Sequence, residues 1–239
     1  EVFVPVKKGP FRFYQQYVSP DKDIVIGEVR ATEPVKGFFT PVKEKVAELF
    51  NPEPIRKKQK PAAIVGVKAC DLKGFLVQDQ VFCKGCQDPF YHRAREANLI
   101  ISADCTQVID SCFCLALGVN PYPESHFDIN LSEVTGGFLV EVGSPKGEQV
   151  VEGHKSLFQE ADGSRVAKKE EGRTRIAAEV QRNFSEMGSD DLDPKWRLPL
   201  ERAIEATELY QSALRGFAKP WTREFVLLRQ QSRDALATG

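Results

Sequence analysis

The sequence predicts an α/β fold: a mixed sheet with a parallel β-α-β core, a following β-hairpin and a helical C-terminal part. Two short apolar runs, Ala62–Ala69 and Leu99–Ala103, are separated by residues with helical spacing, the pattern of a β-α-β unit. Two more apolar runs flank the turn-rich stretch Glu133–Gly137, as in a hairpin. From Ser156 onward the chain is densely charged and its apolar residues recur at helical spacing.

Length and charge limit the classes of protein to which the chain can belong. Its 239 residues suffice for one large or two modest domains. We expect an α/β domain over 1–155 and a helical extension over 156–239 that packs on the first part or on a partner. The formal net charge is only −1, which argues against nucleic-acid binding because that requires a basic excess. No apolar run is long enough to span a bilayer, so we expect a cytoplasmic protein without a transmembrane segment.

The first 61 residues predict short strands, then a helix and a polar connector. Helical spacing of apolar residues predicts the helix over Pro41–Phe50, and Asn51–Pro61 is the proline-bearing connector. The strand candidates are Val2–Val6, Phe11–Tyr17 and Ile24–Val29.

The central part carries the clearest signals. Ala62–Ala69 predicts a buried strand, and Asp71 is a candidate N-cap for the helix that follows. Asp88 followed by proline predicts a second helix start, and Leu99–Ala103 predicts the next strand. Because a helical crossover joins parallel strands, both strands should end at the same edge of the sheet.

The last part predicts a hairpin followed by helices. The charged stretch Arg165–Arg175 continues into apolar residues at helical spacing, and Asp193-Pro194 should open another helix. We expect the charged tail from Pro220 to be helical as well. The hairpin strands are expected at Phe127–Leu131 and Phe138–Val142, with a further short strand at Gln149–Val151.

Four of the six cysteines stand where these predictions bring them together. Cys70 and Cys105 directly follow the two parallel strands, and Cys112 and Cys114 come from the loop just beyond. Ligand sites in open α/β sheets favour that edge. Four thiolates suit a soft metal centre and favour an iron–sulfur cluster. Structural zinc and buried cysteines without a metal are the alternatives.

Cys83 and Cys86 form a separate Cys-x-x-Cys pair. Such a pair is a common half-site for zinc or an iron–sulfur cluster, and it also serves as a redox dithiol. The pair is therefore a candidate for a second metal site or a reactive thiol pair. The three histidines are His92, His126 and His154, and we expect surface or packing roles for them. No catalytic arrangement and no nucleotide-binding motif is recognisable.

Short motifs in a consistent order resemble the N-terminal domain of the iron–sulfur beta subunits of sulfhydrogenases, which are cytosolic [NiFe] hydrogenases. The A-type subunits of anaerobic sulfite reductases are similar. The resemblance runs over roughly residues 2–198. The motifs are Val-Phe-Val-Pro-Val-Lys at 2–7, Pro-Val-Lys-Gly-Phe-Phe-Thr-Pro at 34–41, Ala-Cys-Asp-Leu at 69–72, Asp-Pro-Phe-Tyr at 88–91, Arg-Ala-Arg-Glu at 93–96, Ile-Ile-Ser-Ala-Asp-Cys at 100–105, Cys-Phe-Cys at 112–114, Phe-Asp-Ile-Asn-Leu at 127–131, Gly-Phe-Leu-Val-Glu-Val-Gly-Ser-Pro-Lys-Gly at 137–147 and Asp-Pro-Lys-Trp-Arg at 193–197.

The resemblance implies that Cys70, Cys105, Cys112 and Cys114 hold one [4Fe-4S] cluster. It also implies a non-catalytic subunit of a cytosolic anaerobic redox complex, which relays electrons between a flavoprotein that handles NAD(P) and a catalytic or ferredoxin-like subunit. The family pattern continues into a ferredoxin-like domain with paired cysteine runs. No cysteine follows Cys114 here, so we expect those clusters to be absent or to belong to another chain. The Cys83/Cys86 pair lies outside the family pattern.

Two other classes of function compete with the relay. One is a zinc-stabilised structural adaptor subunit of a multi-protein complex, and the other is a thiol redox protein that uses Cys83 and Cys86.

Overall fold

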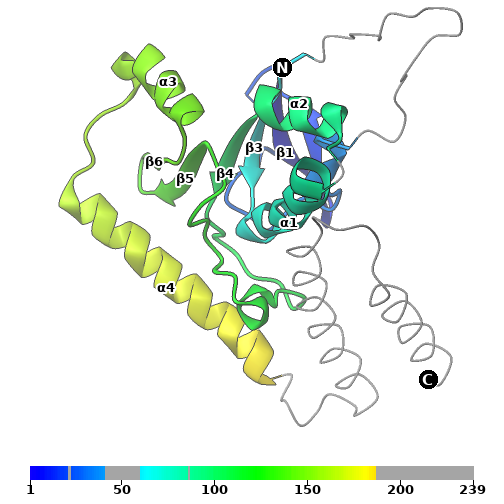
Figure 1. Cartoon of the computed structure of the whole chain (residues 1–239). Helices are drawn as coiled ribbons and strands as arrows, with labels where there is room; N and C mark the ends of the chain where they lie inside the picture. The colour runs from blue at the N-terminus through cyan, green and yellow to red at the C-terminus, as the bar shows by residue number, and fades with distance from the viewer. Residues whose placement is uncertain (21–22, 41–59, 86, 187–239) are drawn as a thin grey trace, which may run out of the picture.

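The computed structural model describes residues 1–20, 23–40, 60–85 and 87–186. They contain a six-stranded mixed sheet in the order β2-β1-β3-β4-β5-β6 (Figure 1). The expected α/β class, with its parallel core and hairpin, is confirmed. The strands are β1 (Val2–Lys8), β2 (Phe11–Gln16), β3 (Ala63–Val67), β4 (Leu99–Ala103), β5 (Ile129–Val134) and β6 (Gly137–Val142).

Strand direction explains why distant segments meet at one edge. Strands β1, β3, β4 and β5 pair in parallel, while β2 and β6 pair antiparallel at the two sides of the sheet. The parallel strands therefore all end at the same edge, which is the edge where the chain continues past β3 and β4.

Helices lie between and after the strands. The crossover from β3 to β4 is helical, and α4 packs against β5, β6 and the short helix η3. In Figure 1, α4 lies on the β5–β6 side of the sheet, away from α1 and α2. The helices are η1 (Val35–Phe38), α1 (Ala69–Asp79), η2 (Gln80–Gly85), α2 (Pro89–Ala97), η3 (Cys114–Leu117), α3 (Pro145–Gly153), η4 (Lys155–Leu157) and α4 (Gly163–Glu186).

Side chains alternate in direction along the strands, so the buried apolar residues form one cluster on each face of the sheet. Ile64 and Ile100 point to the face covered by α1 and α2, whereas Val65 and Ile101 belong to a smaller cluster on the other face. The larger cluster also contains Val35, Phe39, Val67, Leu72, Phe75, Tyr91, Ala94 and Phe127. Burial of these apolar side chains is the main stabilising contribution to the fold.

The predicted start of α2 is confirmed, and the predicted start of α1 is wrong. The Asp88 carboxylate accepts hydrogen bonds from the amides of Phe90 and Tyr91 at 2.8 and 3.1 Å, with Pro89 in the first turn. Helix α1 instead begins at Ala69, two residues before Asp71, and its N-cap has no capping side chain. Strand β3 runs almost directly into α1, so Asp71 falls inside the first turn. A carboxylate in that turn is still favourable because it faces the positive end of the helix dipole.

Two strand predictions are also wrong. Gln149–Val151 lies within α3, which starts at Ser144-Pro145 with the Ser144 hydroxyl accepting from the amide of Gly147. That start carries the same cap-then-proline signal as α2. In Ile24–Val29, only an isolated bridge from Ile24 to Val6 has strand character. The segment bonds irregularly instead, and the amide of Thr106 donates to the carbonyl of Gly27 at 2.7 Å.

Other expectations for the sequence lie outside the described residues. These are the helix at Pro41–Phe50, nearly all of the connector that follows it, the helix at Asp193-Pro194 and the tail from Pro220. The domain boundary near residue 155 stays a prediction. No helix in the part of the chain that the structure describes is both long and apolar enough to cross a membrane.

Candidate metal centre

Four cysteines lie around the carboxyl edge of the parallel strands. Cys70 is the second residue of α1, just beyond β3, and Cys105 is two residues beyond β4. Cys112 and Cys114 come from the loop that leads into η3, and Cys114 is its first residue. All four thiols are partly buried and none forms a disulfide. Cys70 lies 35 positions before Cys105, and the β-α-β topology places both at the same edge of the sheet.

The thiols are close enough to act on one another electrostatically. Burial raises the pKa of Cys70 to about 12, and nearby Asp71 and Cys105 add to the rise. Burial likewise raises the pKa of Cys105 to about 11, with Lys68 opposing the rise and Cys114 and Cys112 adding to it. For Cys114 the rise in pKa comes from burial and from Cys112. A group of thiols that resist ionisation together needs a positive centre to hold them as thiolates.

Backbone hydrogen bonds fold the cysteine loop back on itself. The amide of Cys105 donates to the carbonyl of Pro121 at 2.9 Å, and that of Val119 donates to the carbonyl of Cys114 at 3.0 Å. The amide of Ile109 points at the sulfur of Cys112 at 3.5 Å. Hydrogen bonds from amides to sulfur are among the features that set the properties of a thiolate-bound metal.

The thiols do not stand in the positions that a single metal ion would require. Among the residues that the structure describes, no three His, Cys, Asp or Glu side chains are grouped closely enough to hold one ion. Zinc draws its four ligands onto one atom, at about 2.3 Å for sulfur. An iron–sulfur cube is wider, because each thiolate binds a different iron, so its ligands stand further apart. Four thiols are ligands that both structural zinc and an iron–sulfur cube use.

A glycine bulge near the end of β3 lies four residues before Cys70. The register between β3 and β4 shifts between Val65 and Val67, and Gly66 between them has a φ of +79°. A side chain there would meet the ring of Pro5 at 2.9 Å, so only glycine fits the turn and the close approach of β1.

A buried lysine lies directly behind this edge of the sheet. Lys68 is 1% exposed, and its ammonium donates to the carbonyls of Ile26, Asp104 and Ala103 at 2.7, 3.2 and 3.4 Å. Burial lowers the pKa of Lys68, while the surrounding thiols and carboxyls act in the opposite direction. Its three hydrogen bonds tie the segment around Ile26 to the end of β4.

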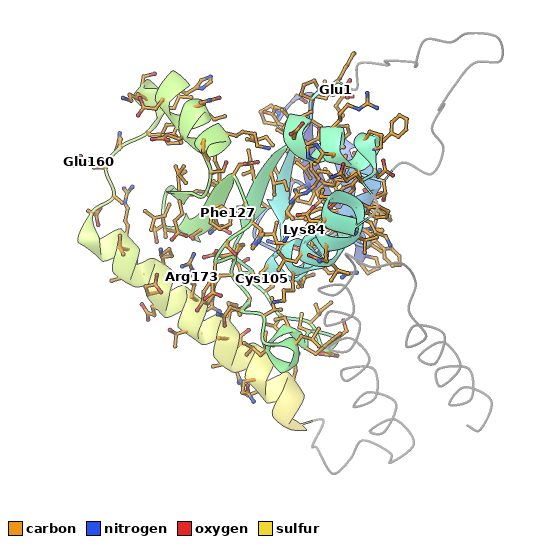
Figure 2. The ribbon with its side chains drawn as sticks, viewed as in Figure 1. Glu1, Lys84, Cys105, Phe127, Glu160 and Arg173 are labelled. Carbon is orange, nitrogen blue, oxygen red and sulfur yellow. The ribbon has the colours of Figure 1, made fainter. Side chains whose placement is uncertain are left out.

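Asp104 and Arg173 form a second buried contact behind Cys105. The carboxylate of Asp104 receives the guanidinium of Arg173 from α4, and Figure 2 labels Arg173 and Cys105 near each other. Neither of these residues, nor Lys68, was among the candidate site residues in the sequence. Lys68 and Asp104 could have been noticed because they are charged residues close to the strand-end cysteines. Arg173 could not, because it is 69 positions from Asp104.

Of the two cysteines of the candidate second site, only Cys83 is among the described residues. Cys83 lies in η2, is partly buried and packs against the larger core cluster. Burial raises its pKa, and the carboxylate of Asp79 adds to the rise. Cys86 lies outside the described residues. A metal or redox role for this pair stays a prediction.

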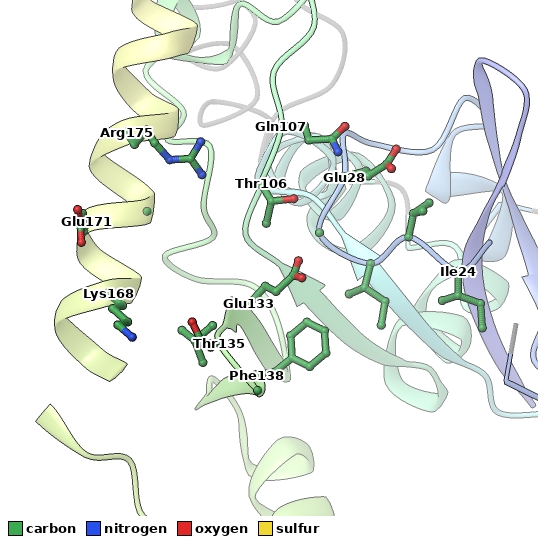
Figure 3. A pocket seen from close by; sticks show the side chains of 16 residues that line it. Ile24, Glu28, Thr106, Gln107, Glu133, Thr135, Phe138, Lys168, Glu171 and Arg175 are labelled. Atoms are coloured by element: carbon green, nitrogen blue, oxygen red, sulfur yellow. The ribbon is translucent and has the colours of Figure 1, made fainter. Parts of the chain in front are cut away.

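An open cavity of about 970 Å³ lies next to the cysteine loop (Figure 3). Lys168, Glu171 and Arg175 of α4 line one side, and Thr106, the residue after Cys105, belongs to the opposite side. Its lining mixes acidic, basic and apolar groups, so its composition does not select one class of ligand.

Comparison with known proteins supports the resemblance found in the motifs. The chain is 26% identical over 192 residues to sulfhydrogenase 2 subunit beta of Pyrococcus furiosus, and the match covers 80% of this chain and 57% of that protein. This chain is related to the sulfhydrogenase beta subunits. The predicted resemblance to sulfhydrogenase beta subunits is thereby confirmed at the level of the family. This chain thus spans little more than half the length of that sulfhydrogenase subunit. No protein-family model matches the chain, and no solved structure matches it.

Proposed function

We propose that this chain is an electron-transfer subunit that holds one [4Fe-4S] cluster on Cys70, Cys105, Cys112 and Cys114. The observation that carries the proposal is that Cys70 and Cys105 follow two adjacent parallel strands at one edge of the sheet, with Cys112 and Cys114 in the next loop and none of the four in a disulfide. A cluster bound there supplies one-electron chemistry. The chain supplies the ligands, their orientation and their burial.

The surroundings of Cys70 favour an anionic centre. Cys70 lies in the first turn of α1, where free amides and the helix dipole stabilise negative charge. Arg30 also opposes the rise in the pKa of this thiol, because its positive charge favours the thiolate. Four thiolates around a cube carry net negative charge, so these groups would stabilise the loaded site.

The related sulfhydrogenase protein is named as a subunit, and this supports a place for the chain in a multi-subunit redox complex. We propose that its partners are a flavoprotein and a catalytic or ferredoxin-like subunit, and that the complex works in the cytoplasm of an anaerobic cell. Within that complex the chain itself would perform no catalysis.

Metal analysis tests the cluster directly. Protein purified without oxygen is assayed for iron, acid-labile sulfide and zinc. About four irons and four sulfides per chain are expected for one cube. About eight of each would add a second cluster at Cys83 and Cys86. Zinc without sulfide would overturn the relay and support the structural adaptor.

Serine variants test the ligand assignment. Cys112→Ser should lose most of the iron and the visible absorbance, because one of four thiolates is removed. The matched control is Cys83→Ser, which removes a partly buried thiol outside the proposed ligand set and should retain about four irons. Full iron content in the Cys112 variant would contradict the assignment. A redox role for the Cys83 pair would instead appear as two thiols that titrate only after reduction.

A further inference from the structure

We propose that Arg173 of α4 is a positioning residue for this metal centre, acting through Asp104 and Tyr122 to fix Cys105. The inference rests on the proposed function, because it assigns a role to Arg173 only if Cys105 is a cluster ligand.

The first step is the contact between Arg173 and Asp104. The side chain of Arg173 is 11% exposed, and the Nε and Nη2 edge of its guanidinium faces the carboxylate. Its Nε donates to Oδ2 at 2.8 Å and its Nη2 donates to Oδ1 at 3.3 Å. Such paired, charge-assisted hydrogen bonds fix orientation as well as distance, and only arginine can make them.

The second step is that three further groups donate hydrogen bonds to Asp104. Its carboxylate also accepts from the Asn130 amide at 2.9 Å and from the Ser132 hydroxyl at 2.7 Å. Its main-chain carbonyl accepts from the ammonium of Lys68 at 3.2 Å. Asp104 is 7% exposed, so its charge depends on these partners. Because Cys105 is the next residue, the contacts of Asp104 also restrain the backbone at Cys105.

The third step is that Arg173 also packs against the segment that binds the amide of Cys105. The guanidinium carbon lies 4.5 Å from the centre of the Tyr122 ring. Tyr122 follows Pro121, whose carbonyl accepts the Cys105 amide at 2.9 Å. Arg173 therefore touches both the residue before Cys105 and the segment that binds its amide.

The guanidinium is itself anchored. Its Nη2 donates to Glu141 of β6 at 2.6 Å, and Lys169 donates to the other oxygen of that carboxylate at 2.8 Å. Further along α4, Asn183 donates from its side-chain amide to the carbonyl of Ile109 at 2.8 Å. Helix α4 thus contacts the cysteine loop through two residues, Arg173 and Asn183. Of these two, Arg173 is the buried and charged residue.

The experiment compares cluster loss among variants at one position. Anaerobic protein is mixed with an excess of a ferrous-iron chelator, and the visible absorbance is followed. Arg173→Gln should lose the cluster roughly 10- to 100-fold faster than wild type, by analogy with the factor by which removing an outer partner of a metal ligand lowers metal affinity or activity. Arg173→Lys should restore part of the retention, because it keeps the charge but not the fork. The control Arg175→Gln changes an exposed arginine two residues away and should leave the rate unchanged.

A spectroscopic readout separates positioning from general loss of stability. The electron paramagnetic resonance signal of the reduced cluster should change its g values in Arg173→Gln and keep them in the Arg175 control. Wild-type g values together with a wild-type rate of loss would overturn the proposal. Faster loss with unchanged g values would also overturn it, because α4 would then act only on stability.

A second variant covers the case in which the first does not fold. Arg173→Gln leaves the Asp104 carboxylate buried without its counter-charge, whereas adding Asp104→Asn removes both charges. If the single variant does not accumulate, altered g values in the double variant support the proposal and wild-type values overturn it. Wild-type protein without iron and sulfide would overturn the proposed function and this inference with it. Wild-type protein with four irons and unaffected Arg173 variants would overturn this inference alone.

Discussion

Gly147 lies where the first turn of α3 passes over the backbone of Asp128. A side-chain carbon at this position would lie 1.9 Å from the Asp128 carbonyl oxygen. Asp128 cannot move away, because its buried carboxylate accepts the amide of Ile100 at 2.8 Å and the hydroxyl of Ser144 at 2.5 Å. The close contact therefore requires glycine.

Gly147→Ala should accordingly lower the free energy of unfolding by about 1–3 kcal/mol, the usual cost of overpacking against a part that cannot yield. Urea unfolding measures this cost. The control is Gly153→Ala in the same helix, where no atom lies within 4 Å of the added carbon. The control should change stability by less than about 1 kcal/mol, because alanine reduces the freedom of the unfolded chain. Equal effects of the two substitutions would show that the contact with Asp128 does not limit residue 147.

The chemistry of single residues made the cysteines predictable as ligands. It did not predict the buried charged residues that lie next to them, Lys68 and Arg173. The thiols stand out because soft metal ligands are few and their spacing is unusual. Lys68 stands in the predicted buried strand and Arg173 in a charged helical stretch, and nothing nearby in the chain marks the partners of either residue. Their burial follows from contacts with segments 36 and 69 positions away.

At the scale of single elements, a cap followed by proline marks the starts of α2 and α3, whereas no capping side chain marks the start of α1. Asp88-Pro89 predicted α2 correctly. The same kind of signal at Ser144-Pro145 marks α3, but the apolar pair Val150–Val151 suggested a strand there. Short apolar runs fit both states, and length and caps must decide between them. Helix α1 has no capping side chain because β3 runs straight into it, so no local signal marks its start.

Two apolar residues fix α4 to the rest of the protein. Ile176 and Val180 are 1% and 2% exposed, and they lie one turn apart on the same face of the helix. Ile176→Ala should lower the free energy of unfolding by about 2–5 kcal/mol, because it leaves a cavity in a buried contact. Val166→Ala on the same helix is the control, since Val166 is 41% exposed. It should cost less than about 0.5 kcal/mol. Urea unfolding of both variants checks the difference, and similar costs would show that α4 is not anchored at Ile176.

At the scale of the whole molecule, the parallel topology was the most informative prediction. A helical crossover between two apolar runs implied that Cys70 and Cys105 would share an edge, and the strand pairing places both there. The sequence did not indicate that β1 would pair in parallel with β3, because the segment between them is long and partly irregular. Pairing between strands about 60 positions apart depends on the complete core and not on any local pattern.

The charge network gives the whole protein a defined dependence on pH. Burial alone would raise the pKa of Glu28, but hydrogen bonds from Lys7 and Arg12 outweigh burial and lower it. The pKa of Glu141 is lowered in the same way through Lys169, Asn130 and Arg173. A carboxyl with a lowered folded-state pKa stabilises the protein above its unfolded value, near 4.3 for Glu. That stabilisation is lost as the pH falls through the lowered pKa.

Glu28→Gln isolates one of these contributions. Glu28 joins β1 and β2 to the irregular segment that follows them, through Lys7 at 3.1 Å and Arg12 at 2.7 Å. At pH 7 the variant should be less stable than wild type by about 1–2 kcal/mol, because it loses two hydrogen bonds to a charged group. The difference should begin to shrink near pH 4.3, where the carboxyl of the unfolded chain is protonated, and should vanish only below the lowered folded-state pKa of Glu28. Urea unfolding at a series of pH values measures it, with Glu160→Gln as the exposed control. A difference that stays constant between pH 7 and pH 3 would show that packing, and not charge, gives Glu28 its role.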